Sequence, residues 1–214
     1  AAISKHTNAF KVNEDVVIPL PRMAEYTDGI ERINIELSLR NKLKLADDLT
    51  AFFAQGNLPL GKTDDAADVA STDLLEDRVQ QALALLAEVR AQWAGWLADV
   101  DPLFPQLQDH TLRASWKTQI RTPLQSIFSG LAFVPVLDEC KAIHKRVLKG
   151  RVWVALHMHA GDGNVHTNIP VNSDDYEMLQ TAHEAVARIM VLARGLDGVI
   201  SGEHGIGITK LEFL

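Results

Sequence analysis

Residues 151–171, RVWVALHMHAGDGNVHTNIPV, contain the pattern of a β-hairpin. Arg151–His159 and Val165–Val171 are runs of residue types that favour strands. The stretch between them, Gly161–Asn164, reads Gly-Asp-Gly-Asn, which is typical of a tight turn. The sequence therefore predicts an antiparallel pair of strands at this point of the chain.

The same hairpin is expected to bring polar side chains together. With Gly161–Asn164 as a four-residue loop, His159 lies opposite His166, and His157 lies opposite Asn168. Side chains directly across a ladder have Cβ atoms about 4.5–5.5 Å apart. Two imidazoles at that separation can bind one divalent metal ion. The hairpin thus predicts a polar patch that contains two metal ligands.

Helical patterns surround the hairpin. Apolar residues recur at helical spacing before it, and a further helix is expected between Asp175 and Gly195, because Ser173, Asp174 and Asp175 suit exposed N-terminal amides. This order of elements predicts an α+β fold, in which helices cover one face of an antiparallel, ferredoxin-like sheet and a helical insertion occupies about residues 56–135. The other predicted elements are a strand at Asp15–Ile18, helices at Arg22–Phe53, Leu74–Asp99 and Leu137–Leu148, and a short helix near Trp116–Phe128 that Pro123 interrupts.

The composition is that of an ordinary globular protein. Of 214 residues, 47% are hydrophobic and 23% are charged, which is enough for one core or two small ones. A formal net charge of −7 makes nucleic acid and anionic membranes poor partners. No segment approaches the roughly 18 apolar residues of a transmembrane helix. The single cysteine, Cys140, indicates a reducing compartment and excludes a sulfur-rich metal site, so a cytoplasmic protein, soluble or peripheral at a membrane, is expected.

Glu203 is the natural third ligand for a metal ion at the hairpin. It lies in the loop Ser201–Gly207, whose glycines let the backbone turn sharply and approach a ligand closely. A divalent ion bound by imidazoles often takes a carboxylate as well and keeps one position open for substrate. The neighbouring His204 would then act as a base. The remaining histidines are interpreted as packed or exposed residues without a role in the site: His6, His110, His144 and His183.

Two motifs resemble those of a known family. The segments HAGDGNVH, residues 159–166, and SGEHGIG, residues 201–207, are similar to the two signature motifs of the FAD-linked oxidase C-terminal domain. That family includes D-lactate dehydrogenases, the flavin subunit of glycolate oxidase and D-2-hydroxyglutarate dehydrogenase. Glu14–Pro19 followed by Arg22 resembles the segment where such chains leave the flavin domain and begin the cap domain.

The resemblance implies an oxidoreductase that transfers hydride from a small D-2-hydroxy acid to FAD. Residues 1–14 would be the end of the connection from the flavin domain, and residues 15–214 would be the substrate- and metal-binding cap. Its partners would be the protein's own FAD domain and an electron-acceptor protein or quinone. Without the FAD domain, the chain is expected to bind no FAD tightly and to be inactive. The implied roles are zinc or manganese ligation by His159, His166 and Glu203, substrate contact by Asn168 and Lys210, and general base catalysis by His204.

One position departs from the family pattern. Family members usually have a lysine two residues before the aspartate that corresponds to Asp15, and an arginine further upstream for the substrate carboxylate. Here Asn13 takes the place of that lysine. Lys5 and Lys11 are weak substitutes for these cations, which leaves the choice of hydroxy acid open.

Two other functions fit the residues. A metal-dependent hydrolase could use a metal-activated water with Glu203 or His204 as base. A non-enzymatic interaction domain could use the helices at Arg22–Phe53 and Leu74–Asp99 for assembly, with histidines that only pack. A histidine-triad nucleotide hydrolase is set aside, because Gly161 occupies its third histidine position.

Overall fold

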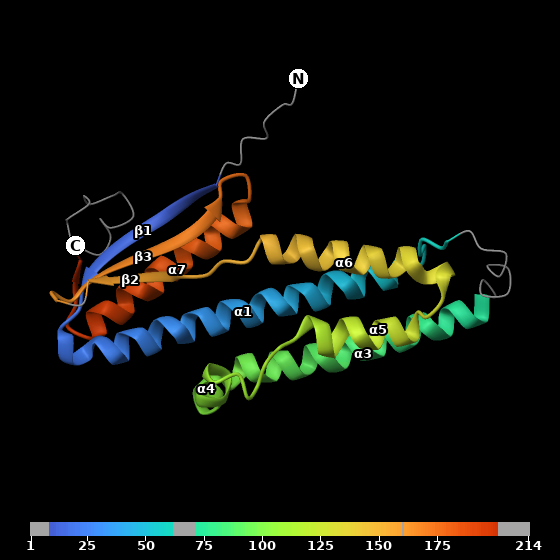
Figure 1. Cartoon of the computed structure of the whole chain (residues 1–214), viewed down its shortest axis with the longest axis horizontal. Coiled ribbons are helices and arrows are strands. Elements are labelled where there is room, and N and C mark those ends of the chain that lie inside the picture. The colour runs from blue at the N-terminus through green and yellow to red at the C-terminus, as the bar shows by residue number, and fades with distance from the viewer. Residues whose placement is uncertain (1–8, 62–71, 160, 201–214) are drawn as a thin grey trace, which may run out of the picture. The chain divides into compact units, whose positions relative to one another are not determined.

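A computed structural model of the chain describes residues 9–61, 72–159 and 161–200. The chain divides into two compact units, which we call the sheet unit, residues 1–38 with 150–214, and the helical unit, residues 39–149. The helices and the antiparallel sheet (Figure 1) confirm the predicted α+β class with a helical insertion.

The sheet unit has four antiparallel strands in the order β2-β3-β1-β4. Along the chain the order is strand, helix, two strands, helix and strand, which is the ferredoxin-like arrangement. The helical unit, residues 39–149, consists of the second part of the first helix and the helices that follow it before the second strand. The elements are β1 Ala9–Val17, η1 Leu20–Arg22, α1 Met23–Ala54, β2 Ala155–His159, β3 Asn164–Asn172, α7 Tyr176–Gly195 and β4 Val199–Ile200.

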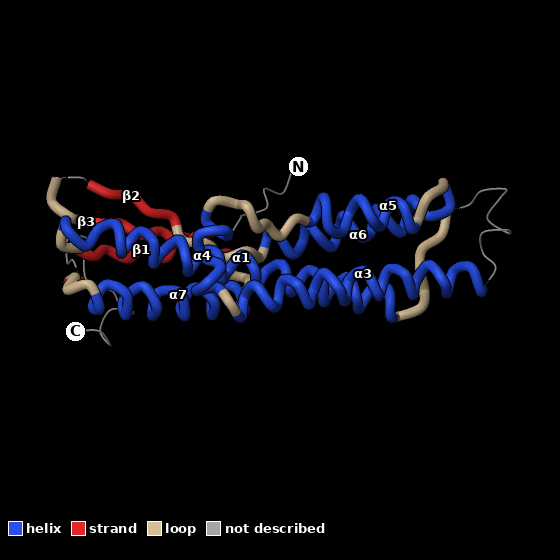
Figure 2. Tube along the Cα trace, turned by 90° about the horizontal axis from the view of Figure 1, so that it is seen from below, coloured by secondary structure: helices blue, strands red, loops and turns tan. Residues whose placement is uncertain are grey.

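The core of the sheet unit lies between one face of the sheet and two helices. Side chains alternate between the faces of a strand, so β3 directs Val165, Ile169 and Val171 to one side, where all three are buried. They pack with Tyr26 of α1 and Ile189 of α7 in one apolar cluster. Figure 2 shows the strands (red) and the helices (blue) of this unit from below. Burial of this face leaves the opposite face of the sheet for polar side chains.

The start of α7 confirms the predicted capping pattern. The Asp175 carboxylate accepts a hydrogen bond of 3.0 Å from the backbone N–H of Met178. This bond satisfies one of the N–H groups that have no partner within a helix, and the negative charge suits the helix dipole there. The helix ends at Gly195, as predicted.

The hairpin register differs from the predicted one. His157, not His159, lies opposite His166, and His159 lies opposite Asn164. β3 begins at Asn164, one residue earlier than predicted, because Asn164 pairs with Val17 of β1. Gly163 holds this position: it has φ +73°, and its carbonyl accepts a 2.9 Å bond from the N–H of Ile18. A turn that lies one residue earlier shifts the β2 partner of each β3 residue by two positions, which is why His157 and not His159 faces His166.

Two strand boundaries also differ. β1 begins at Ala9 rather than Asp15, because its whole length pairs with β3. β2 begins at Ala155 rather than Arg151. Before it, the Asn34 side chain takes the place of a neighbouring strand: it accepts from the N–H of Val154 at 2.7 Å and donates to its carbonyl at 2.9 Å.

The helical unit has its own apolar core. Trp93, Phe53 and Phe128 are almost completely buried there, and the Phe53 and Phe128 rings stack with centroids 5.3 Å apart. The predicted interruption at Pro123 is wrong: the π-helical turn η2 runs directly into α5, and Pro123 lies in the first turn of α5, where a helix tolerates proline. The elements are the second part of α1 and α3 Thr72–Ala98, α4 Val100–Gln108, η2 Lys117–Arg121, α5 Thr122–Ile127, η3 Leu131–Phe133 and α6 Val134–Lys149.

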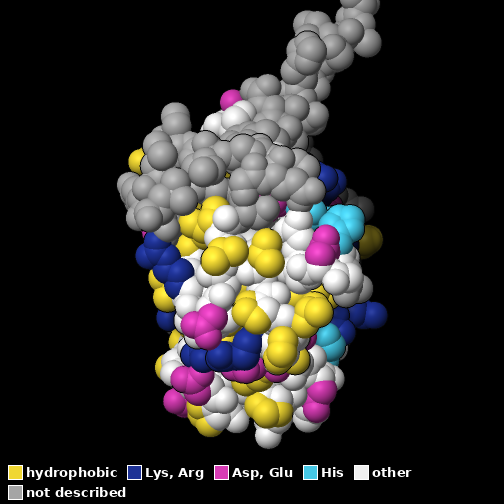
Figure 3. Space-filling view, turned by 90° about the vertical axis from the view of Figure 1, so that its left-hand side faces the viewer, with side chains coloured by type: hydrophobic (Ala, Val, Ile, Leu, Met, Phe, Trp, Pro, Cys, Tyr) yellow, Lys and Arg dark blue, Asp and Glu magenta, His cyan; other side chains and the backbone are white. Residues whose placement is uncertain are grey.

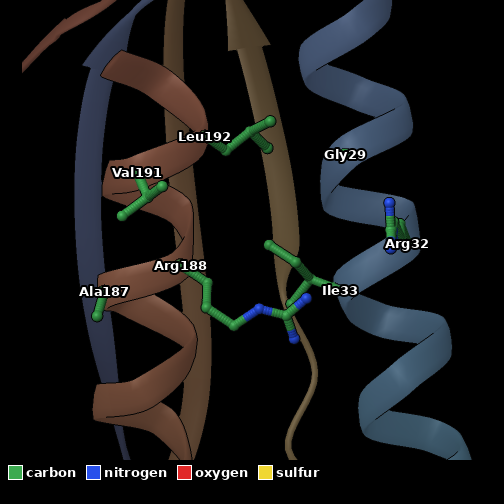
Figure 4. A pocket seen from close by; sticks show the side chains of 7 residues that line it. All are labelled: Gly29, Arg32, Ile33, Ala187, Arg188, Val191 and Leu192. Carbon is green, nitrogen blue, oxygen red and sulfur yellow. The ribbon is translucent and has the colours of Figure 1, made fainter. Parts of the chain in front are cut away.

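Helices α1 and α7 of the sheet unit approach each other closely at Gly29. A Cβ atom at this position would lie 2.5 Å from Cδ2 of Leu192, so a larger residue would displace that side chain. Beside the contact is a mainly apolar groove of about 430 Å³ (Figure 4). At the groove, the Glu36 carboxylate pairs with Arg188 and, at 3.8 Å, with Arg32. Among the helices of residues 9–61, 72–159 and 161–200, none has the length and apolar character needed to span a bilayer.

Candidate metal and substrate site

The face of the sheet opposite the helices carries rows of polar side chains. Asp15 of β1, His166 of β3 and His157 of β2 are paired in register, so their side chains form one row across three strands. In the next row, Asn13 lies opposite Asn168. Pairing places each of these side chains about 4.5–5.5 Å from its neighbour at Cβ.

These five residues line one cavity. Asn13, Asp15, His157, His166 and Asn168 surround a volume of about 400 Å³. The size falls within the range of small-molecule sites. Two imidazoles, two carboxamides and one carboxylate offer both donors and acceptors, as the binding of a polar metabolite requires.

Asp15 and His166 are in hydrogen-bond contact at the cavity wall. Asp15 Oδ1 lies 2.7 Å from His166 Nδ1, and the two side chains are 5% and 18% exposed. An ionised carboxylate only accepts hydrogen bonds, so Nδ1 of His166 donates to it. A neutral imidazole with its hydrogen on Nδ1 carries its lone pair on Nε2, the atom that can ligate a metal ion.

His159 and His166 are close, as predicted, although they are not directly paired. Their ring centroids lie 5.1 Å apart and the ring planes are nearly perpendicular, at 88°. Diagonal neighbours across a ladder remain within reach when their side chains are long or aromatic. His159 is exposed, so its imidazole is accessible from solvent, and the space-filling view shows histidine side chains at the surface (Figure 3). This pair supplies two of the nitrogen donors that zinc or manganese accepts in proteins.

The remaining predicted site residues divide into two groups. Asn168 lines the cavity. Glu203, His204 and Lys210 lie outside the described residues. Within residues 9–61, 72–159 and 161–200, no group of three or more His, Cys, Asp and Glu side chains is arranged to hold a metal ion. The described part of the chain therefore brings two nitrogen donors together, and a third ligand remains a prediction.

Sequence reasoning placed His157 in the polar patch but missed two residues of the cavity wall, Asn13 and Asp15. β1 was predicted as a short strand, without a partner, so nothing placed Asp15 beside His166. Strict alternation gave no signal here, because the polar Glu14 lies between Asn13 and Asp15. The pairing of β1 with β3, which joins segments about 150 residues apart, is what brings Asn13 and Asp15 to the site.

Of the histidines set aside at the start, His110, His144 and His183 do not line this cavity, and His6 lies outside the described residues. His144, in the helical unit, stacks on Trp116 with centroids 4.5 Å apart. Burial, with a smaller effect of the charges of Lys42 and Arg121, lowers the pKa of His144. His183 is exposed on α7.

Residues 135–214 match the family model described as FAD linked oxidases, C-terminal domain. This match confirms the family that the two motifs predicted, and it includes the hairpin and the loop that contains Glu203.

Several curated proteins are similar to part of this chain. Glycolate oxidase subunit GlcD of Bacillus subtilis is 34% identical over 79 residues, which are 37% of this chain and 17% of that protein. D-lactate dehydrogenase of Archaeoglobus fulgidus is 48% identical over 56 residues, 26% of this chain and 12% of that protein. The mitochondrial D-lactate dehydrogenase [cytochrome] 1 of Saccharomyces cerevisiae is 31% identical over 99 residues, 46% of this chain and 15% of that protein. The matched regions thus span less than a fifth of each relative, and no solved structure matches the chain.

Proposed function

We propose that this chain is the substrate- and metal-binding part of an FAD-dependent oxidoreductase that oxidises a small D-2-hydroxy acid. The observation that carries the proposal is the cluster of Asp15, His159 and His166 beside a cavity of about 400 Å³. The family match over residues 135–214 supports the flavin chemistry, and the names of the relatives support D-lactate or glycolate as the type of substrate. The acceptor would be another protein or a quinone.

The donor set suits a divalent ion such as Zn²⁺ or Mn²⁺. His159 and His166 would supply nitrogen ligands and Glu203 a carboxylate, which leaves room for substrate oxygens. When bound, the ion would stabilise negative charge on the substrate hydroxyl oxygen, and FAD would accept the hydride.

The chain's own residues would bind the acid and move one proton. Asn168 lines the cavity, and its carboxamide would hydrogen-bond the substrate, as would Lys210. His204 would take the proton from the substrate hydroxyl as hydride leaves the same carbon, so that the carbon is oxidised by two electrons. The hydrogen bond from Asn168 would help to hold the reacting carbon in one orientation.

The first experiment measures metal content. The purified chain is incubated with Zn²⁺ or Mn²⁺, freed of loosely bound metal and analysed for metal per chain, beside the double variant His159→Ala/His166→Ala. About one ion per chain that is absent from the double variant supports the proposal. His183→Ala, which removes an exposed histidine from α7, is the matched control and should retain the metal. Equal metal content in all three proteins would contradict the site.

The second experiment tests the hydroxy acid. Isothermal titration of the zinc-loaded chain with D-lactate, L-lactate and glycolate should show binding that His159→Ala/His166→Ala abolishes. FAD added to the same chain should stay largely unbound, since we attribute flavin binding to a separate domain. Hydrolysis of simple esters by the zinc-loaded chain, without flavin, would instead favour a metal-dependent hydrolase.

A further inference from the structure

We propose that Asp15 is a positioning residue for the metal site: its carboxylate fixes His166 with the hydrogen on Nδ1, so that Nε2 is presented to the ion. This inference rests on the proposed metal-binding function and adds to it a residue from the opposite end of the chain. Asp15 lies in β1, about 150 residues before His166, and outside the matched segment 135–214.

The contact is held by the backbone of the sheet. Asp15 and His166 are direct partners in the β1–β3 ladder, so their Cβ atoms are fixed next to each other by main-chain hydrogen bonds. The Asp15 side chain is 5% exposed, and its Oδ1 is 2.7 Å from Nδ1. A buried carboxylate at this distance restricts both the rotation of the ring and the choice of tautomer.

The orientation matters for ligation. A histidine that ligates a metal ion usually donates its other ring N–H to a carboxylate or carbonyl, and loss of that partner typically costs about 10- to 100-fold in metal affinity. His159 is exposed and is a diagonal neighbour of His166. The orientation of the two metal-binding rings therefore depends on His166, whose ring is held by Asp15. Asp15 therefore orients His166, and through it the pair of His159 and His166.

A merely structural ion pair would behave differently from a positioning residue. If the contact only held β1 to β3, its loss would lower stability and leave the tautomer and the metal affinity of the folded protein unchanged. If it positions His166, its loss changes both in protein that remains folded. The two roles are separated by measuring the tautomer of the metal-free protein as well as zinc affinity.

The test compares Asp15→Asn with Asp15→Ala. The asparagine oxygen can still accept from Nδ1, so Asp15→Asn should keep the tautomer and lose less affinity, and should fold even if Asp15→Ala does not. In Asp15→Ala, zinc affinity measured with a competing chelator should fall about 10- to 100-fold. Nitrogen-15 NMR of metal-free protein at pH 8 should show Nδ1–H for His166 in the wild type and a mixture of tautomers in Asp15→Ala.

Asp138→Ala is the control, because it removes the same charge from an exposed position in α6 of the helical unit. It should match the wild type in both measurements. Wild-type zinc affinity in a folded Asp15→Ala protein, or Nε2–H as the main His166 tautomer of the wild type, would overturn the inference. If the wild type binds no zinc, the proposed function fails, whereas the NMR measurement still decides whether Asp15 sets the tautomer.

Discussion

The rings of His159 and His166 lie 5.1 Å apart although the residues are diagonal neighbours, and the direct partner of His166 is His157. The two histidines of β2 therefore differ in surroundings: His157 lines the cavity with Asn13 and Asn168, whereas His159 packs edge-on against the ring of His166. From this difference we predict separate roles, with His157 toward substrate and His159 toward the metal ion.

The first prediction follows from that division. Loss of a residue that only hydrogen-bonds a metal ligand typically lowers metal affinity roughly 10- to 100-fold. His159→Ala removes a ligand itself, so its zinc affinity should fall by more than that. His157→Ala should retain zinc within about threefold of the wild type and should weaken binding of D-lactate to the zinc-loaded chain. Chelator competition and calorimetry measure the two effects. The reverse result, with zinc lost in His157→Ala, would assign ligation to the directly paired histidine.

The helices and the proximity of the histidines were predictable from local patterns, but the register was not. Helical periodicity gave α1 and α7 almost to the residue, because an apolar stripe and a capping Asp175 act within a few residues. The turn sequence allowed two loop positions, and the choice depends on β1, far away in the chain, which pairs with Asn164 through Val17. Long-range pairing of this kind leaves no trace in a short stretch of sequence.

Gly163 provides the second prediction. Its φ of +73° is unfavourable for other residues, and a Cβ atom there would lie 2.4 Å from the carbonyl oxygen of Ile18, which is backbone and cannot move aside easily. Gly163→Ala should therefore reduce the free energy of unfolding by at least about 1–3 kcal/mol. Urea denaturation measures the loss.

Gly161 in the same turn is the control, because a Cβ atom there would meet no atom within 4 Å. Gly161→Ala should change stability by less than about 0.5 kcal/mol. Similar losses in both variants would show that the turn has no defined contact with Ile18.

Cys140 provides the third prediction. The thiol is buried in the helical unit with 1% of its surface exposed, and burial, with a smaller contribution from Glu139, raises its pKa to about 12. Thiolate is the reactive form of cysteine. With this pKa, the thiolate fraction is roughly 1000-fold smaller than for a thiol with the ordinary pKa of 9.0. At pH 8, Ellman's reagent should label the folded chain far more slowly than the chain in urea. Rapid and complete labelling without urea would show that α6 opens readily.

The composition predicted that Cys140 forms no internal disulfide, but it did not predict that the thiol is buried. A lone cysteine indicates no internal disulfide, which is a matter of counting. Its burial depends on the face of α6 on which it lies: Val136, Cys140, Ile143 and Val147 recur at helical spacing and are all buried. Asn34 shows the opposite case, since no local pattern indicates that its side chain would replace a strand partner for Val154.

The fourth prediction concerns pH and His144. Its pKa in the folded chain lies below the ordinary value of 6.5, because of burial and then the charges of Lys42 and Arg121. The unfolded chain therefore binds a proton at a pH where folded His144 is still neutral. Stability from this residue is present above about pH 6.5, and it is lost as the pH falls from there to the lower folded pKa.

Replacement of His144 by phenylalanine isolates this effect. His144→Phe retains a flat ring to stack on Trp116 and removes the titrating group. Urea unfolding at intervals from pH 5 to pH 8 should show a smaller loss of stability on acidification for His144→Phe than for the wild type. His183→Phe, at an exposed position of α7, should follow the wild-type curve. Parallel curves for His144→Phe and the wild type would mean that Lys42, Arg121 and burial leave the proton affinity of His144 the same in both states.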